Sequence, residues 1–239
     1  MLPSVSRSLL KAALENALIT KPALLKPHLS FPTFLDVPLQ VGPLLRKDNP
    51  PTIRGLVLDN DNTLSPSRDP YYHPAYLKAI EAFKQAEPFS TNPNSMLIVS
   101  NRAGAKPEYD GEVEILEKEL SLPVLHHKGE KEIKPVIAPM VLEHFSKNNV
   151  TSDPQEIAVV GDRLFTDVLM ARLMGSWSIY ISDGWKDPEN PKTKRGSVGW
   201  GEWFYTWAER YRYGSLNEKV SPVEPGVGSL LEFLETKKE

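Results

Sequence analysis

The segment Leu56-Val57-Leu58-Asp59-Asn60-Asp61-Asn62-Thr63 decides the fold, because an uncharged apolar run passes directly into a cluster of polar residues. Residues 53–58 are typical of a strand buried on both faces, and Asp59 follows the last of them. Further along, short apolar runs alternate with helical patterns up to residue 190, which is the rhythm of repeated βαβ units. We therefore predict an α/β domain with a doubly wound parallel sheet across residues 51–190.

The other elements of this domain follow from the same periodicities. Strands are expected at residues 96–99, 123–125, 157–160 and 178–181. Helices are expected at residues 73–85, 113–120 and 165–174, and a further helix should begin at Pro135. Ligands of parallel sheets bind at the carboxyl ends of the strands, so the chemistry should lie just after Leu58, Val99 and Val160.

Composition excludes several classes of function. The chain has 239 residues, a formal net charge of −3 and a pI near 6.0, which gives no reason to expect nucleic acid as a partner. It has no cysteine, which excludes disulfides, zinc thiolate sites and cysteine nucleophiles. Its longest stretch without a charged residue, residues 88–101, is shorter than the roughly 20 apolar residues of a membrane span. Any membrane contact is therefore expected at the bilayer surface.

Polar residues gather after three of the predicted strands. Asp59 and Asp61 follow the first strand, Ser100 and Asn101 the second, and Asp162 the fourth. These strand ends share one edge of the sheet, so the three carboxylates should converge there, where they repel one another unless a cation is present. Oxygen ligands suit Mg²⁺, which keeps several waters and shares its coordination with a phosphate.

Two further groups complete a phosphate site. Ser100 offers a hydroxyl donor, and Lys134 offers a cation directly before Pro135. A Mg²⁺ ion would let an anionic carboxylate approach an anionic phosphate and would neutralise charge in the transition state. The residues therefore predict phosphoryl transfer, with no histidine needed.

These segments resemble the four motifs of the haloacid dehalogenase superfamily, in the family's order. The DxDxT motif matches Asp59, Asp61 and Thr63, and the Ser/Thr that ends the second strand matches Ser100. The motif lysine matches Lys134, with Lys128 and Lys131 as weaker candidates. The GDxxxxD motif is matched by residues 161–167, which include Asp162 and Asp167.

The resemblance implies a role for each matching residue. Asp59 is the nucleophile that forms an aspartyl-phosphate, and Asp61 is the general acid and base. Mg²⁺ is held by Asp59, the backbone carbonyl of Asp61, and Asp162. Because the family's phosphatases carry the second aspartate, Asp61 indicates phosphate hydrolysis.

The remaining site residues are expected to bind the phosphoryl group or to support those that do. Ser100 and Lys134 hold the phosphoryl group, and Asp167 orients Lys134 or a metal-bound water. The further predicted phosphate contacts are Asn60 and Asn101, and the supporting residue is Thr63. Arg102 could contact a second phosphate.

The spacing of the motifs limits the substrate. Residues 64–99 and 101–133 are too few to hold a separate cap domain as well as the predicted elements. An uncapped site is open and suits a phosphate presented on a protein, a nucleic acid end or a membrane lipid. Residues 1–50 are expected to form an N-terminal arm and residues 191–239 an aromatic-rich extension.

Three features favour a lipid. Residues 6–18 can form an amphipathic helix with basic residues beside its apolar stripe. Residues 200–213 are crowded with Trp and Tyr, which favour the membrane–water interface. The sequence segments LDNDNTL, SNRAG and GDRLFTDVLMAR resemble those of the mitochondrial phosphatidylglycerophosphate phosphatases and their bacterial relatives.

This narrower resemblance implies hydrolysis of phosphatidylglycerophosphate to phosphatidylglycerol, the precursor of cardiolipin. It also implies peripheral attachment to the matrix side of the inner mitochondrial membrane. Other interpretations stay open: the N-terminal stretch could dock on the core or act as a targeting signal, and the aromatic segment could pack internally or form an oligomer surface. The alternatives to a lipid phosphatase are a soluble phosphatase for a phosphoprotein or nucleotide and a membrane-attached scaffold with a vestigial site.

Overall fold

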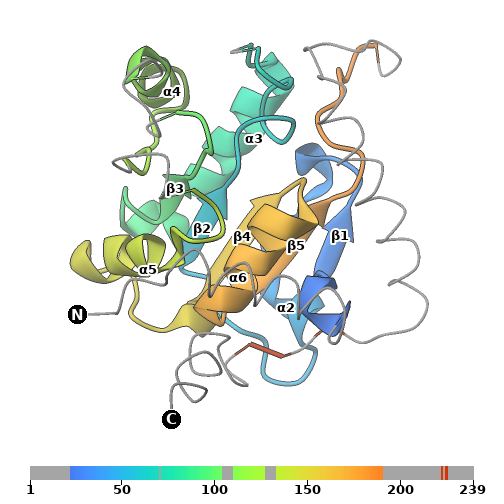
Figure 1. Ribbon diagram of the computed structural model, residues 1–239, viewed down its shortest axis with the longest axis vertical. Helices are drawn as coiled ribbons and strands as arrows, with labels where there is room; N and C mark the ends of the chain where they lie inside the picture. The colour runs from blue at the N-terminus through green and yellow to red at the C-terminus, as the bar shows by residue number, and fades with distance from the viewer. Residues whose placement is uncertain are drawn as a thin grey trace.

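The computed structural model describes residues 22–69, 71–103, 110–126 and 133–190, together with residues 222, 224 and 225. Within these residues, five parallel strands form one sheet in the order β1-β5-β4-β2-β3 (Figure 1). The strands are β1 (Leu29–Phe31), β2 (Gly55–Leu58), β3 (Met96–Ile98), β4 (Ile157–Gly161) and β5 (Trp177–Ile181). The expected α/β fold with a parallel sheet is therefore observed.

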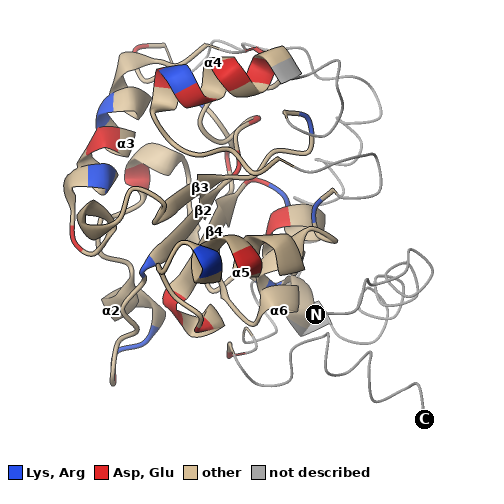
Figure 2. Cartoon of the chain, turned by 90° about the vertical axis from the view of Figure 1, so that its left-hand side faces the viewer, with Lys and Arg blue, Asp and Glu red and all other residues tan. Residues whose placement is uncertain are grey.

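Four of the five described strands, β2 to β5, are buried because both faces of the sheet are covered. Every residue of β2, β3, β4 and β5 is buried, and none of them is charged. Figure 2 shows β2, β3 and β4 without charged residues, whereas Lys, Arg, Asp and Glu lie on the helices around them. Continuous apolar runs of this kind are expected for parallel strands.

Helices pack against both faces of the sheet. One core cluster joins alternate strand residues such as Leu56 and Leu58 to α3 (Pro74–Gln85) and α4 (Asp110–Leu120). A second cluster joins the strand residues that point the other way, such as Val57, to α5 (Ala138–Lys147) and α6 (Leu169–Met174). Figure 1 shows α5 and α6 in front of the sheet. The alternation of side chains along each strand thus divides the apolar core into two layers.

Short elements connect these layers. They are η1 (Pro22–Leu25), η2 (Phe34–Asp36), α2 (Gly42–Leu45), η3 (Phe89–Thr91), η5 (Pro154–Glu156) and the π-helical turn η6 (Leu164–Val168). α3 begins at Pro74 because the ring nitrogen of His73 accepts the backbone N–H of Ala75 at 3.1 Å. α6 ends at Gly175, whose φ of 72° is in the left-handed region that favours glycine.

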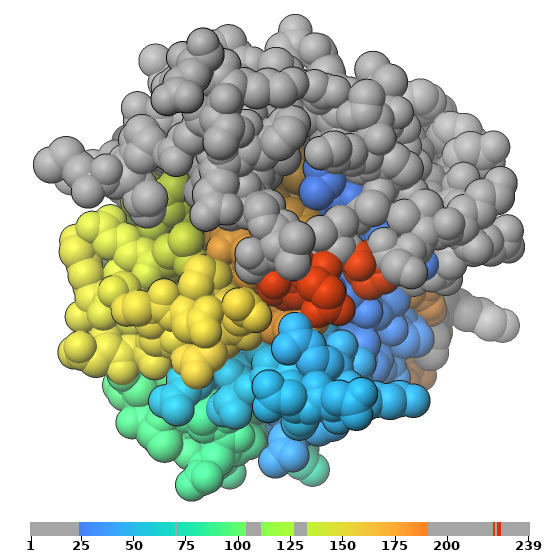
Figure 3. Space-filling model, turned by 90° about the horizontal axis from the view of Figure 1, so that it is seen from below, coloured from blue at the N-terminus to red at the C-terminus, as the bar shows by residue number. Residues whose placement is uncertain are grey.

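The predicted start of the core at residue 51 is too late. β1 pairs with β5, and Phe34, which follows β1, is fully buried in the larger core cluster. The periodicity missed this strand because it has three residues, all of intermediate burial. Arg46 and Glu224 form an ion pair of 3.0 Å, and Figure 3 shows the red C-terminal residues against the blue segment that precedes β2.

Two other predicted elements differ from the structure. The helix expected to open at Pro135 begins at Ala138 instead, with Pro139 in its first turn, while residues 134–137 form a turn. Both prolines suit the start of a helix, and the sequence pattern does not choose between them. Residues 123–125 contribute a single bridge, between Ile98 and Val124, rather than a full strand.

The described residues include no helix that is long and apolar enough to cross a bilayer. The predicted amphipathic helix at 6–18, the aromatic segment 200–213 and the alternative lysines Lys128 and Lys131 lie outside the described residues.

Candidate active site

The site lies where β2 has β4 on one side and β3 on the other. β4 follows β3 in the chain but pairs on the opposite side of β2, so the strand order reverses at β2. The backbone N–H of Asp59 donates to Val160 at 2.9 Å, and that of Val99 donates to Leu58 at 3.0 Å. The residues that follow these three strands therefore share one edge, at the kind of switch point where open α/β sheets bind ligands.

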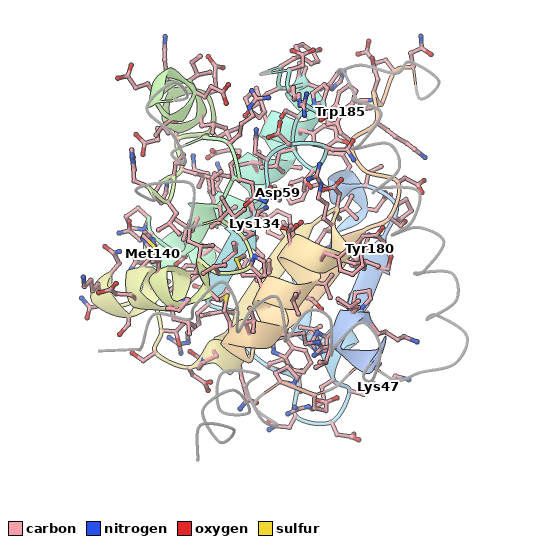
Figure 4. The ribbon with its side chains drawn as sticks, viewed as in Figure 1. Lys47, Asp59, Lys134, Met140, Tyr180 and Trp185 are labelled. Atoms are coloured by element: carbon pink, nitrogen blue, oxygen red, sulfur yellow. The ribbon has the colours of Figure 1, made fainter. Side chains whose placement is uncertain are left out.

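Asp59 forms a buried ion pair with Lys134. Lys134 Nζ lies 2.5 Å from Asp59 Oδ1 and 2.6 Å from Asp167 Oδ1. All three side chains are at least nine-tenths buried. Figure 4 shows Asp59 and Lys134 side by side near the end of β2. One cation thus bridges two carboxylates from motifs that are far apart in the sequence.

Burial and charge set the protonation of this group. Burial alone would lower the pKa of Lys134, but the neighbouring Asp167 and Asp59 raise it above its ordinary value, so the lysine stays charged. Burial raises the pKa of Asp59, and Lys134 opposes that rise. Burial, and next the charge of Asp59, raise the pKa of Asp162 well above its ordinary value.

Asp162 is the carboxylate with an open acceptor. Its Oδ2 accepts a hydrogen bond of 2.7 Å from Asn62 Nδ2, whereas its buried Oδ1 has no hydrogen-bond partner among the described residues. Oxygens of Asp59, Asp162 and Asp167 lie within 4.8 Å of one another. An oxygen-only donor set with one orphaned anionic oxygen fits a hard divalent cation such as Mg²⁺.

Asp167 supports the site instead of adding an obvious cation ligand. Its Oδ1 accepts from Lys134, and its Oδ2 accepts the backbone N–H of Arg163 at 3.2 Å and the hydroxyl of Thr166 at 3.3 Å. Asp59 and Asp162 are therefore the side chains best placed to hold the cation.

Gly161 is required by the close approach of Asp167. A Cβ at residue 161 would lie 2.3 Å from Asp167 Cγ and 2.4 Å from its Oδ2. These separations are far below van der Waals contact, so any side chain there would displace the carboxylate that holds Lys134. Steric exclusion therefore explains why the GDxxxxD motif has glycine at this position.

Asp61 lies at the border of a polar pocket of about 180 Å³. Its Oδ1 accepts the backbone N–H of Arg68 at 2.9 Å and lies 3.9 Å from Arg102 Nη1. The pocket is lined by Asp59, Asp61, Ser67, Arg68, Asn101, Arg102, Lys134, Arg163 and Thr166. The buried Asp59 is thus reached through an opening that is polar and rich in cations.

The other predicted site residues are all near the pocket, but they do not all line it. Asn101 lines it, and its Oδ1 accepts the backbone N–H of Lys134 at 2.8 Å. Ser100 is buried, and its Oγ accepts the backbone N–H groups of Arg102 and Ala103. Thr63 is buried, with its hydroxyl 3.5 Å from Asp59 Oδ2.

Asn60 is turned away from this pocket. Its side-chain oxygen accepts a hydrogen bond of 2.7 Å from the hydroxyl of the buried Tyr72. The predicted phosphate contact of Asn60 therefore stays a prediction, and its carboxamide oxygen anchors the loop after β2.

The structure adds residues that sequence reasoning missed. Asn62 donates to Asp162, and its φ of 59° places it in the left-handed region, which asparagine tolerates. Arg163 lines the pocket and opposes the rise in the pKa of both Asp59 and Asp162. Their positions beside motif residues could have indicated both, because Asn62 lies inside the DxDxT motif and Arg163 directly follows Asp162.

Comparison with known proteins identifies the family of this chain. The family model described as mitochondrial PGP phosphatase matches residues 10–186. The mitochondrial phosphatidylglycerophosphatase GEP4 of Saccharomyces cerevisiae is 38% identical over 178 residues, which cover 74% of this chain and 88% of that protein. A probable mitochondrial phosphatidylglycerophosphatase of Schizosaccharomyces pombe is 30% identical over 170 residues, 70% of this chain and 78% of that protein. No solved structure matches. The resemblance seen in the sequence is confirmed, and the chain belongs to the mitochondrial PGP phosphatase family.

Proposed function

We propose that this protein hydrolyses the terminal phosphate of phosphatidylglycerophosphate, giving phosphatidylglycerol for cardiolipin synthesis and inorganic phosphate. The names of its relatives support the substrate. The observation that carries the chemistry is the buried Asp59, held by Lys134 beside the open oxygen of Asp162 and facing a cation-rich pocket. A carboxylate in this setting is a nucleophile and not a surface charge.

In the first half of the reaction, a carboxylate oxygen of Asp59 attacks phosphorus and forms an aspartyl-phosphate. The bond from phosphorus to the glycerol oxygen breaks, and Asp61 gives its proton to that oxygen. Lys134 keeps Asp59 in place, because its ammonium is itself fixed by Asp167. The reacting groups are therefore positioned before substrate arrives, which avoids an entropic cost in the transition state.

In the second half, Asp61 takes a proton from a water molecule whose oxygen attacks phosphorus. The bond between phosphorus and Asp59 breaks, so inorganic phosphate leaves and the carboxylate returns to its starting state. Asp61 suits this double use because it lies at the border of the pocket, where side-chain exposure of 23% admits water.

We propose Mg²⁺ as the cofactor, held by Asp59, Asp162 and the backbone carbonyl of Asp61. When bound, it would neutralise the carboxylates and the developing negative charge on the phosphoryl oxygens. Asn62 fixes the orientation of Asp162 through its hydrogen bond to Oδ2, which leaves Oδ1 available.

The proposal includes an open site and a peripheral attachment to membrane. The doubly wound core has no separate cap domain, and the segments 6–18 and 200–213 contact anionic lipid on the matrix side of the inner mitochondrial membrane. The mitochondrial relatives support the compartment. The polar, open pocket supports a phosphate presented by a lipid headgroup.

The test is phosphate release from phosphatidylglycerophosphate in anionic vesicles with Mg²⁺, alongside a soluble aryl phosphate. The lipid should be hydrolysed much faster than the aryl ester. Asp59→Asn keeps the shape but removes the nucleophile, so it should lose essentially all activity. Cleavage of the aryl ester alone would contradict the lipid substrate, and turnover that survives Asp59→Asn would contradict the mechanism.

A further inference from the structure

The pocket is lined by two arginines, Arg68 and Arg102, in addition to the lysine that is paired with Asp59 and Asp167. Lys134 and the proposed cation already serve the reacting phosphoryl group, yet Arg68 and Arg102 also line the pocket. Both arginines lie next to Asp61, through the 2.9 Å hydrogen bond from the Arg68 backbone and the 3.9 Å ion pair with Arg102. The Arg102 guanidinium therefore lies beside the proposed general acid, Arg68 lines the same pocket, and a second anion is a ligand that two guanidinium groups suit.

Arg102 is held in a fixed orientation by α4. Its Nε and Nη2 atoms donate to the two oxygens of Glu112, at 2.9 and 2.6 Å. Its third nitrogen, Nη1, forms an ion pair of 3.9 Å with Asp61 Oδ1. A side-on pair of this kind fixes the plane of the guanidinium and orders it in advance for an anion.

The position of Asp61 indicates what occupies this part of the pocket. A general acid must lie beside the oxygen it protonates, so the leaving group lies next to Asp61. In phosphatidylglycerophosphate this leaving group is a glycerol whose other end carries the phosphodiester of the lipid. The next charged group along the substrate after the leaving oxygen is therefore an anion, and Arg102 is a cation that lies beside Asp61.

Arg68 occupies a backbone conformation that supports the same interpretation. Its φ of 58° is in the left-handed region, which is uncommon for a residue with a long side chain. This conformation belongs to the turn in which the Arg68 N–H reaches Asp61. The turn thus places a second guanidinium on the wall of the same pocket.

We propose that Arg102, oriented by Glu112 and assisted by Arg68, binds the phosphodiester of the substrate. The pocket then recognises two phosphates joined by one glycerol, and not the terminal phosphate alone. This inference rests on the proposed function and adds the origin of headgroup specificity. It also predicts discrimination against phosphatidic acid, which has a phosphomonoester but no phosphodiester.

The test compares two water-soluble substrates, so that attraction to a charged membrane plays no part. One is deacylated phosphatidylglycerophosphate, which carries both phosphates, and the other is sn-glycerol 3-phosphate, which carries only the monoester. Full-length wild type and Arg102→Gln are assayed for kcat/KM on both, with Arg102→Lys and Glu112→Gln as graded variants. Arg54→Gln is the matched control, because Arg54 is an exposed arginine paired with Glu156 before the start of β2.

Wild type should prefer the two-phosphate substrate, and Arg102→Gln should reduce that preference roughly 10- to 100-fold, the size of a lost charge-assisted hydrogen bond. Arg102→Lys and Glu112→Gln should reduce it less, and Arg54→Gln should leave it unchanged. An equal loss on both substrates would assign Arg102 to catalysis or folding and overturn the inference. An unchanged preference in Arg102→Gln would overturn it as well.

Failure of the proposed function would give a different result. In that case wild type would release no phosphate from the lipid in vesicles or from its deacylated form, although it cleaved an aryl phosphate. If wild type hydrolyses the lipid but cleaves the two soluble substrates equally well, the proposed function stands and the phosphodiester subsite does not.

Discussion

Replacing Asp162 by Asn should separate the stability of this fold from its use of a cation. Asn keeps an oxygen that can accept the hydrogen bond from Asn62 and removes one charge from the buried cluster. We expect Asp162→Asn to be more stable than wild type without Mg²⁺. We also expect it to lose the stabilisation that Mg²⁺ gives to wild type.

The magnitude follows from the spacing of the carboxylates. Two unit charges 4.8 Å apart repel by about 3.5 kcal/mol at an effective dielectric constant of about 20. Asp162 faces Asp59 and Asp167, and the attraction of Arg163 offsets part of this repulsion. A net gain of about 1–3 kcal/mol for the substitution is expected, or about 3–10 °C in Tm for a chain of this length.

The difference in stability between Asp162→Asn and wild type should change with pH in a definite direction. The pKa of Asp162 is raised in the folded protein, by burial first and by Asp59 next, so folding favours the protonated form. The stability that the protonated Asp162 contributes is fully present below the ordinary carboxyl pKa of 3.8. It is lost as the pH rises through the raised pKa of the folded protein. Without Mg²⁺, the advantage of Asp162→Asn over wild type should therefore grow from pH 4 towards neutrality.

Thermal unfolding with and without Mg²⁺ at several pH values measures both effects. At 100 times its Kd, Mg²⁺ should stabilise wild type by about 2.7 kcal/mol, and less at acid pH, where protons compete for the carboxylates. Glu81→Gln, on the exposed surface of α3, controls for loss of one acidic charge. Equal stabilisation of wild type and Asp162→Asn by Mg²⁺ would refute the assignment of this carboxylate to the cation.

Three other substitutions test the packing of the site and of the core. Gly161→Ala should lower kcat/KM at least about 100-fold by displacing Asp167, as steady-state kinetics would show, and full activity would contradict the steric account. Lys134→Met should lower stability in urea by about 3–5 kcal/mol because two buried carboxylates lose their cation, whereas a loss below about 1 kcal/mol would contradict the pairing. Phe145→Ala should cost about 3–5 kcal/mol in the same assay while the folded enzyme keeps its kcat, since Phe145 is fully buried in the core under α5.

Most of the sheet could be predicted because its middle strands are buried on both faces. Such strands are continuous apolar runs, and the polar residue that ends each run, such as Asp59 or Ser100, marks the edge of the sheet. β1 could not be found in this way. Leu29–Phe31 is a short edge strand of intermediate burial, and its place is decided by pairing with β5, about 150 residues away.

The same distinction separates what could and could not be predicted in the site. The motifs indicated which residues meet at the edge of the sheet, because Asp59 and Asp162 follow neighbouring strands and Lys134 pairs with Asp59. The contacts among them are long-range, and no local pattern records them: Asn62 holds Asp162, and Glu112 holds Arg102. Asn60 is the clearest example of a contact that the sequence does not predict. It lies inside the DxDxT motif, yet its side-chain oxygen accepts a hydrogen bond from Tyr72.

The order of the strands bears on how this protein is synthesised. β1 and β2 leave the ribosome early, but β4 and β5 lie between them in the sheet. The facing edges of β1 and β2 therefore stay unpaired until residues 157–181 have emerged, and pairings of such long range form slowly. Asp162 lies in the same segment, so Asp59 emerges long before the carboxylate that lies beside it in the folded protein. Activity begins only when the last two strands enter the sheet.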